Sequence, residues 1–298
     1  MTDRRRLVRV PASSANLGPG YDALAAALDI QLELEVSEVG AFEVDTGGEG
    51  LPTGRDNLCV RAFERLHTAD GLRFGIRSDI PVARGLGSSA AAIVAGLLAA
   101  DHLYELGLDP PDIYRHAVEL EGHPDNVAAA LFGGFAVCPP DPSADSPATP
   151  VLPARLEPPQ GVEGVLAIPA DEVPTETARA ALPADVPMAD AVANIAAASH
   201  LVLGIERSDL TLISRGLSDR LHQQRRAEIY PRSIELLAEA GEVGAIGATI
   251  SGAGPAVLFW CFWQDTGKVV DALGKRSDGD VEIRRARFTP LGADVPEL

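Results

Sequence analysis

Lysine is almost absent from this chain of 298 residues, in which Lys268 and Lys275 are the only two and arginine supplies the other basic side chains. A Walker A loop requires a glycine–lysine pair followed by serine or threonine, whereas Val269 and Arg276 follow these lysines. A protein kinase requires a strand lysine and a His-Arg-Asp loop, and the sequence has neither. The dinucleotide fingerprint G-x-G-x-x-G behind a strand is missing as well. The common lysine-dependent and dinucleotide-binding classes are therefore excluded.

Cysteine is also scarce. Cys59, Cys138 and Cys261 lie far apart, and no C-x-x-C pair occurs. An odd number of widely spaced cysteines argues against a disulfide framework and against a zinc site. We therefore expect three buried thiols.

No uninterrupted apolar run in the sequence is long enough to cross a membrane. The longest uninterrupted stretch of apolar residues and glycine is 90–100, well below the roughly 18 to 20 residues that a spanning helix needs. The basic N-terminus is not followed by the apolar segment of a signal peptide. The net charge of −18 repels nucleic acid and anionic lipid. We expect a soluble cytoplasmic protein without nucleic-acid or membrane partners, in which an anionic ligand binds through local donors.

The patterns that are present predict a mixture of strands and helices. Period-2 alternation predicts strands over 28–39 and 72–80, and helical spacing predicts a helix over 57–66 that Asp56 or Asn57 caps. Residues 88–106 are apolar nearly all round, which predicts a buried helix. Further predicted elements are helices at 110–122, 126–132, 175–182, 188–206, 208–220, 231–241 and 265–274, and strands at 133–138, 164–170, 243–250, 256–262 and 280–288.

A proline-rich segment, 139–160, contains few core residues and divides the chain. We predict an N-terminal domain over 1–155 and a C-terminal domain over 156–298. Neither half alternates strand and helix regularly, which favours an α+β fold over a doubly wound parallel sheet.

Three glycine-rich stretches lie at predicted strand–helix or strand–strand junctions. They are PASSANLGPGYD (11–22), PVARGLGSSAA (81–91) and ATISGAGPAVLF (248–259). One such stretch is weak support for a ligand site, because glycine serves any turn that needs a positive φ. Three stretches that each combine glycine with serine or asparagine are a stronger indication.

The middle stretch has the chemistry of a phosphate site. Gly85 and Gly87 allow backbone N–H groups to turn toward an anion, and Ser88 and Ser89 start the long helix. The first N–H groups of a helix have no internal partner, and the helix dipole favours an anion there. Arg84 adds a positive side chain. A phosphate can therefore bind without lysine, although the stretch taken alone is also compatible with a tight turn and a serine N-cap.

In this order the three stretches resemble the three motifs of the GHMP kinases, the family of galactokinase, homoserine kinase and mevalonate kinase. Three further segments are similar to those of the homoserine kinases within that family. They are EGHPDNVAAALFGGF (121–135), PTETARAALP (174–183) and DRLHQQRR (219–226). The resemblance covers about residues 7–260.

The resemblance implies an N-terminal domain with a left-handed βαβ unit, a C-terminal ferredoxin-like domain and a site between them. It also implies ATP and Mg²⁺, an ion that prefers hard oxygen ligands. The implied nucleotide-binding residues are Pro81, Val82, Ala83, Arg84, Gly85, Leu86, Gly87, Ser88, Ser89 and Ala90. The implied metal ligands are Ser88 or Ser89 together with Glu121, and Glu119 stays open as the alternative glutamate.

The implied acceptor is L-homoserine, whose site needs donors for a carboxylate and acceptors for an ammonium group. Arg179 and Arg226 would bind the carboxylate through their guanidinium groups. His123 would contact the substrate or orient its loop. The implied acceptor site is Asn16, Asp22, His123, Asn126, Arg179, Arg226 and Gly252, and its catalytic members are Asn16, Asp22 and Asn126.

The resemblance implies no dedicated general base. Asp125 is the nearest acid and precedes Asn126, which is implied to orient the hydroxyl. Positioning and charge neutralisation carry most of the catalysis of phosphoryl transfer, so we predict direct attack of the hydroxyl oxygen on the γ-phosphorus. Two alternatives stay open: a kinase of this family that acts on mevalonate, shikimate or a sugar, and a non-catalytic ligand-binding regulator. The oligomeric state also stays open, a homodimer included.

Overall fold

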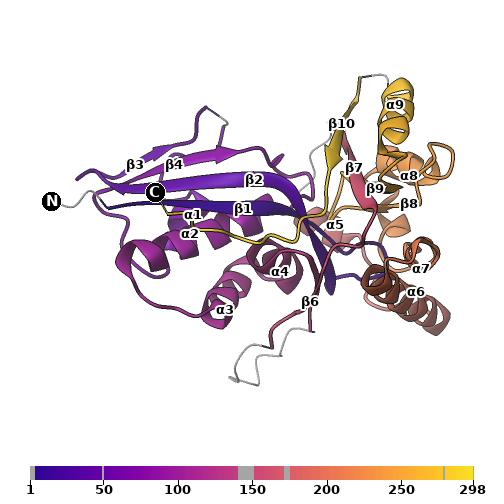
Figure 1. Cartoon of the computed structure of the whole chain (residues 1–298), viewed down its shortest axis with the longest axis horizontal. Coiled ribbons are helices and arrows are strands. Elements are labelled where there is room, and N and C mark those ends of the chain that lie inside the picture. Colours follow the sequence, from indigo (N-terminus) through magenta and orange to yellow (C-terminus); the bar gives the residue numbers. More distant parts are fainter. Residues whose placement is uncertain (1–3, 49, 140–150, 171–174, 278, 298) are drawn as a thin grey trace.

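The computed structural model describes residues 4–48, 50–139, 151–170, 175–277 and 279–297 (Figure 1). Its strands are β1 (Arg5–Ala15), β2 (Leu24–Glu38), β3 (Glu43–Asp45), β4 (Leu72–Ser78), β5 (Phe135–Val137), β6 (Ala154–Leu156), β7 (Val162–Pro169), β8 (Gly247–Ile250), β9 (Val257–Phe262) and β10 (Val281–Ala286). Its helices are α1 (Leu58–Glu64), α2 (Ser88–Tyr104), α3 (Pro110–Glu121), α4 (Pro124–Phe132), α5 (Thr175–Ala180), α6 (Met188–Arg207), α7 (Leu210–Gly216), the 3₁₀ turn η1 (Gln224–Arg226), α8 (Pro231–Ala238) and α9 (Thr266–Arg276).

The first sheet has the strand order β3-β4-β2-β5-β6, and β1 pairs with β2. All its pairs are antiparallel except β3 and β4, which are parallel and are connected through α1. Helices α1 to α4 lie together on one side of this sheet (Figure 1). Strand β1 was not predicted, although Val8, Val10 and Ala12 alternate in its sequence and are buried.

Helix α2 confirms the prediction of a helix that is buried nearly all round. It starts at Ser88, and Gly87 occupies the N-cap position with a φ of 68°. No serine therefore caps this helix, which contradicts the tight-turn reading with a serine N-cap. Helix α4 starts at Pro124, two residues before the predicted 126, so Asp125 and Asn126 lie in its first turn. Proline is well suited to this first position because it lacks the backbone N–H that would have no partner there.

The second sheet has the order β10-β7-β9-β8, and all its pairs are antiparallel. In chain order this unit consists of β7, several helices, the consecutive strands β8 and β9, helix α9 and strand β10. This succession and this strand order are those of a ferredoxin-like unit, which confirms the expectation for the second half. Helix α7 covers only the middle of the predicted helix 208–220.

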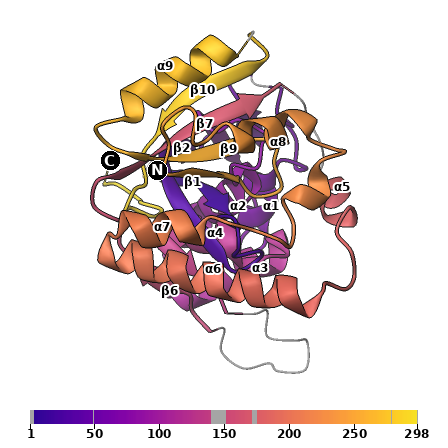
Figure 2. The ribbon, with the colours of Figure 1, turned by 90° about the vertical axis from the view of Figure 1, so that its right-hand side faces the viewer.

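Both faces of the second sheet are buried, which explains the continuous apolar run in β7. Val165 and Ala167 face one side, where α8 and α9 pack, while Leu166 and Ile168 belong to the main core. In Figure 2, α9 lies next to β10 at the top of the view, and α6 with α7 lies below β9, past the opposite end of the strand order. Side chains alternate between the faces of a strand, so a strand that is buried on both faces shows no polar alternation.

The chain beyond β10 returns to the first sheet. Leu28 pairs with Phe288, and Arg9 pairs with Asp294. The two halves are therefore connected both near β6–β7 and through this terminal segment. Residues 140–150 of the predicted linker lie outside the described residues, and the boundary at 155/156 stays a prediction.

Two other expectations concern the thiols and the membrane. Cys59, Cys138 and Cys261 are free and buried, as predicted. Helix α6 is long and apolar enough to cross a membrane by length and composition, a test that the core helix of a soluble protein also passes. Its Leu201 and Ile205 pack in the main core.

Candidate active site

The three glycine-rich stretches meet in space and hydrogen bond to one another. The N–H of Gly252 donates to the carbonyl oxygen of Ala15 (3.0 Å), and Nδ2 of Asn16 donates to the carbonyl oxygen of Gly252 (2.8 Å). Oγ of Ser251 donates to the carbonyl oxygen of Gly85 (2.7 Å). The loop β1–β2, the loop β4–α2 and the loop β8–β9 thus form one assembly.

Two glycines of the middle stretch are required by close packing. A Cβ at Gly85 would lie 2.1 Å from the carbonyl oxygen of Ser251, and one at Gly87 would lie 2.0 Å from Oγ of Ser13. Both residues have positive φ values, 77° and 68°, which side chains with a Cβ rarely adopt. A larger residue at either position would push the loops apart.

A large cavity of about 600 Å³ opens beside the N-terminus of α2. Of the predicted nucleotide-binding residues, those that line it are Val82, Ala83, Gly85, Leu86, Gly87, Ser88 and Ser89. Pro81, Arg84 and Ala90 lie outside this lining, and Nη2 of Arg84 donates to the carbonyl oxygen of Ala170 (2.9 Å). Sequence reasoning did not assign the apolar part of the wall, which includes Leu32, Leu51, Pro52, Leu58 and Ile76.

The two candidate glutamates for the metal lie in different environments. Glu121 lines the large cavity, and its Oε2 accepts a hydrogen bond from Oγ of Ser89 (2.6 Å). Burial raises the pKa of Glu121, and the bond from Ser89 opposes this shift. Glu119 instead forms an ion pair with Arg65 on the surface (2.6 Å). The geometry therefore favours Glu121 over Glu119.

A smaller cavity adjoins the large one and collects the predicted acceptor residues. Asn16, Asp22, His123, Asn126, Arg179, Arg226 and Gly252 all line it, together with Ala15, Tyr21, Asp125 and Ala253. His123, Asn126, Arg179, Gly252 and Ala253 line both cavities. A ligand in one cavity is thus adjacent to a ligand in the other.

The two arginines of the small cavity differ in their charged partners. Arg179 binds Asp22 through two hydrogen bonds of 2.8 and 2.9 Å, and both side chains are partly exposed (42% and 35%). Arg226 is 2% exposed, and within the described residues no carboxylate lies at ion-pair distance from it. Burial lowers the pKa of Arg226, because its surroundings stabilise the cation less well than water does.

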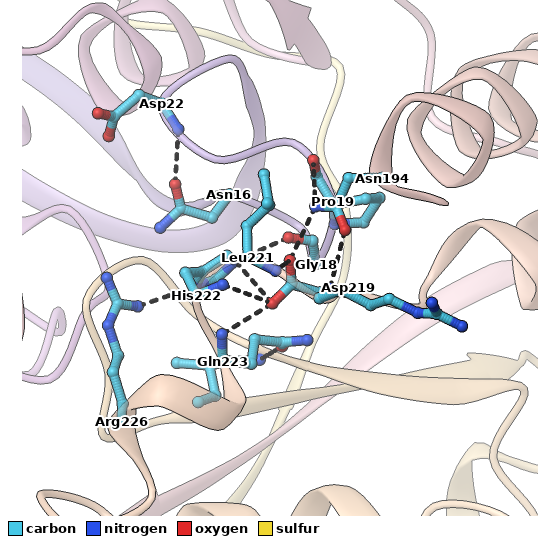
Figure 3. A network of polar contacts seen from close by, with 12 residues as sticks. Asn16, Gly18, Pro19, Asp22, Asn194, Asp219, Leu221, His222, Gln223 and Arg226 are labelled. Atoms are coloured by element: carbon cyan, nitrogen blue, oxygen red, sulfur yellow. Dashed lines mark hydrogen bonds and ion pairs between the residues drawn. The ribbon is translucent and has the colours of Figure 1, made fainter. Parts of the chain in front are cut away.

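Hydrogen bonds to neutral groups hold Arg226 in place. Its Nη1 donates to Nδ1 of His222 (3.1 Å) and to the carbonyl oxygen of Gly252 (3.1 Å), and its Nε donates to the carbonyl oxygen of Ala178 (3.3 Å). Figure 3 shows Arg226, His222 and Asp219 in one polar network with Asn194 and the loop Gly18–Pro19. The ring of Tyr21 faces both Arg179 and Arg226.

The first turn of α4 supplies an acid and an amide to the site. Burial raises the pKa of Asp125 to about 7, and the N–H of Asn126, which donates to Asp125 (2.7 Å), opposes this shift. Oγ of Ser13 donates to Oδ1 of Asn126 (2.8 Å), so the amide nitrogen is the group that Asn126 can offer to a ligand. Burial lowers the pKa of His123, which favours its neutral form.

Ser13, Tyr21, Asp219 and His222 are four of the residues to which sequence reasoning assigned no role. They all lie within the segments that carry the resemblance. Asp219, His222 and Arg226 follow at intervals of three and four residues, but only Gln224–Arg226 forms a helical turn, the 3₁₀ turn η1. Their common position in the segment 219–226 is the signal that could have joined them.

Comparison with known proteins agrees with this architecture. The model of the GHMP kinase N-terminal domain matches residues 57–134, and the model of the GHMP kinase C-terminal domain matches residues 201–278. The homoserine kinase of Thermus thermophilus is 42% identical over 269 residues, which are 89% of each chain. That of Moorella thermoacetica is 40% identical over 263 residues, with 86% of this chain and 87% of that protein covered.

A solved structure extends the agreement to three dimensions. The crystal structure of homoserine kinase from Cytophaga hutchinsonii superposes with a TM-score of 0.85 at 28% identity, and it covers 99% of this chain and 98% of its own. The sequence matches and the fold lead to the same assignment. The chain belongs to the GHMP kinase family.

Proposed function

We propose that this protein transfers the γ-phosphoryl group of ATP to the side-chain hydroxyl of L-homoserine and forms O-phospho-L-homoserine, a step of threonine biosynthesis. One observation carries the choice of acceptor. Arg226 is a buried cation without a carboxylate partner among the described residues, and it lines the same small cavity as the carboxylate of Asp22. The names of the relatives support the same acceptor.

The small cavity suits both charges of an amino acid. A substrate carboxylate would neutralise the charge of Arg226. It would also approach Arg179, whose planar guanidinium group can donate two parallel hydrogen bonds to a carboxylate. Asp22 would accept hydrogen bonds from the ammonium group, and its position is set by Asn16, whose Oδ1 accepts from the N–H of Asp22 (2.9 Å). A neutral sugar would leave Arg226 without a counter-charge, which is costly for a buried ion.

The hydroxyl of the acceptor would lie near Asn126, which lines both cavities. The bond from Ser13 fixes the amide of Asn126, so its nitrogen would donate to the hydroxyl oxygen and direct a lone pair at the phosphorus. The attacking oxygen would form the new P–O bond as the bond from the γ-phosphorus to the β–γ bridging oxygen breaks and ADP leaves. Without a base, the hydroxyl proton would pass to an oxygen of the transferred phosphoryl group. Alignment of this kind accounts for much of the rate in phosphoryl transfer.

The large cavity suits ATP with Mg²⁺. The apolar wall would contact the base, and the backbone N–H groups at the start of α2 would bind phosphate oxygens. No cluster of three or more His, Cys, Asp or Glu side chains that could hold a metal occurs among the described residues, so Ser89 and Glu121 would hold the ion jointly with phosphate oxygens. Bound there, Mg²⁺ would neutralise charge on the transferred phosphoryl group.

Burial gives Asp125 the pKa of a general base. A pKa of about 7 is close to the optimum for proton transfer at neutral pH. Its carboxylate is 3% exposed and lines the small cavity. Direct attack without a base stays our proposal, because Asn126 and not Asp125 lines the boundary between the two cavities.

An ADP-release assay with a panel of acceptors tests the function. The purified protein is given Mg-ATP with L-homoserine, mevalonate, shikimate, galactose or L-threonine in separate reactions. We expect kcat/KM to be highest for L-homoserine, and the product to be identified by mass spectrometry. Preference for another acceptor would replace the substrate assignment, and the absence of ADP release with every acceptor of the panel would support the regulator alternative.

A further inference from the structure

His222 is held in one tautomer by its two neighbours. Its Nε2 lies 2.7 Å from the carbonyl oxygen of Gly18, which can only accept, so Nε2 carries the proton. Its Nδ1 lies 3.1 Å from Nη1 of Arg226, which can only donate, so Nδ1 is unprotonated. The imidazole is therefore neutral, and its complete burial agrees with this because burial lowers the pKa of His222.

A buried carboxylate fixes the backbone that carries His222. Asp219 accepts hydrogen bonds from the N–H groups of Leu221 (2.9 Å), His222 (3.0 Å) and Gln223 (2.7 Å). It also accepts from Nδ2 of Asn194 on α6 (2.8 Å). Figure 3 shows these bonds converging on the carboxylate of Asp219. The imidazole thus has little freedom to rotate or shift.

The hydrogen bonds that Arg226 donates leave one nitrogen of its guanidinium group available to a ligand. Nη1 is saturated by His222 and Gly252, and Nε donates to Ala178. Nη2 makes no hydrogen bond within the part of the chain that the structure describes, and Arg226 lines the small cavity. His222 and Gly252 therefore determine the plane of the guanidinium group and the direction in which Nη2 points.

We propose that His222 is a positioning residue for acceptor binding, which orients Arg226 toward the acceptor carboxylate through its unprotonated Nδ1. The inference rests on the proposed function and adds a residue to its acceptor site. It differs from a purely structural role, because one nitrogen of the ring acts on Arg226 while the other ties the ring to Gly18. The two nitrogens can be separated by substitution.

Two variants separate them. In His222→Asn, Oδ1 lies two bonds from Cβ, as Nδ1 does, and keeps an acceptor for Arg226 while the bond to Gly18 is lost. In His222→Gln, the amide nitrogen lies three bonds from Cβ, as Nε2 does, and keeps the donor to Gly18 while the acceptor at the Nδ1 position is lost. Each variant removes one hydrogen bond, so their thermal midpoints serve as the stability control.

The readout is steady-state kinetics with L-homoserine and with 2-amino-1,4-butanediol, in which a CH₂OH group replaces the carboxylate. We expect His222→Gln to raise the KM for homoserine roughly ten- to hundred-fold, the range for a hydrogen bond to a charged group. Its kcat and its KM for ATP should change little, and its activity with the diol should match that of the wild type. His222→Asn should keep the wild-type KM for homoserine within about three-fold.

Several results would overturn the inference. Equal increases of the KM for homoserine in both variants would show a structural role alone. Equal losses of kcat/KM with homoserine and with the diol would show the same. Wild-type KM values in both variants would show that Arg226 needs no help from His222. If His222→Gln fails to fold, Asp219→Asn provides the same comparison. We then expect kcat/KM to fall with homoserine and not with the diol, and an equal fall with both acceptors would contradict the inference.

The wild-type acceptor panel keeps this test separate from that of the function. If the wild type prefers mevalonate or shikimate, the proposed function fails, but both acceptors carry a carboxylate and the same order of variants is then expected with them. If it prefers an acceptor without a carboxylate, both proposals fail. If it prefers homoserine and the variants do not differ, only the role of His222 is wrong.

Discussion

The two cavities of the site are built in opposite ways. The large cavity is lined mainly by glycines, a helix N-terminus and apolar side chains, whereas Asp22, Asp125 and Arg226 line the small one alone. Backbone donors need close approach, so the first cavity should be sensitive to added volume. Buried charges need partners, so the second should be sensitive to the loss of a charge. Substitutions should therefore separate the binding of the two substrates.

The largest effect is expected at Gly87. In Gly87→Val the new Cβ would lie 2.0 Å from Oγ of Ser13. The backbone at this position also has a φ of 68°. We expect ATP affinity, measured by calorimetry, and kcat/KM to fall by about 10²-fold or more. Gly107 has a similar φ of 73° but open space around its Cβ position, so Gly107→Val is the matched control. A folded Gly87→Val protein with normal ATP affinity would contradict the nucleotide assignment.

The two arginines should differ in their importance for the acceptor. Arg226→Ala should reduce kcat/KM for homoserine by the equivalent of roughly 2–4 kcal/mol, as for a desolvated charge. Arg179→Ala should cost less, because Arg179 is 42% exposed and already paired with Asp22. Calorimetric ATP binding should be unchanged in Arg226→Ala, because Arg226 lines only the small cavity, whereas Arg179 lines both cavities. An effect on ATP as large as that on homoserine would remove the distinction between the cavities.

The pair Asp125–Asn126 tests whether the reaction uses a base. Without one, Asn126→Leu should lower kcat by about 10²-fold, because the hydroxyl loses its alignment, and Asp125→Asn should be milder. With Asp125 as the base, Asp125→Asn should lower kcat by roughly 10²- to 10⁴-fold. The measurement is kcat at saturating Mg-ATP and homoserine. A collapse in Asp125→Asn beside near-normal Asn126→Leu would refute the mechanism without a base.

The glutamates of α3 provide a matched pair for the metal. Glu121→Gln should raise the Mg²⁺ concentration needed for half-maximal activity by roughly ten-fold or more, because a charged oxygen ligand is lost. Glu119→Gln should leave it unchanged, since Glu119 pairs with Arg65 on the surface. Titration with MgCl₂ at fixed ATP distinguishes them. The reverse order would transfer the metal ligand to Glu119.

The smallest effect is expected in the pH dependence of stability. The pKa of Asp125 is about 7 in the folded chain and about 3.9 in the unfolded one. The folded state thus binds more protons between these values, and wild-type stability falls as pH rises from about 4 to 7. Asp125→Asn removes this loss, so it should stabilise the protein at pH 8 by on the order of 1–3 kcal/mol. Thermal melts at pH 4.5 and pH 8 should show a smaller gain at the lower pH.

The sequence alone determined the local parts of the proposed nucleotide site. Gly85, Gly87 and the serines at the start of α2 are adjacent in the chain, and their function depends on backbone angles and a helix end. The same holds for Asn57, which caps α1 and was one of two predicted caps. Such features arise within a few residues, so composition and spacing suffice to predict them. Strand β1 could also have been predicted, since its alternation is in the sequence.

Only the tertiary structure decided which charges act together. Asp22 and Arg179 are 157 positions apart in the chain, yet they form the bidentate pair. Within the part of the chain that the structure describes, that pairing leaves Arg226 as a buried cation without a carboxylate. The distinction between Glu119 and Glu121, two residues apart on α3, likewise depends on which side of the helix faces Ser89. The shift of Asp125 and the tautomer of His222 follow from burial and from partners on other elements. Desolvation and long-range hydrogen bonds are properties of packed side chains, and a linear pattern does not contain them.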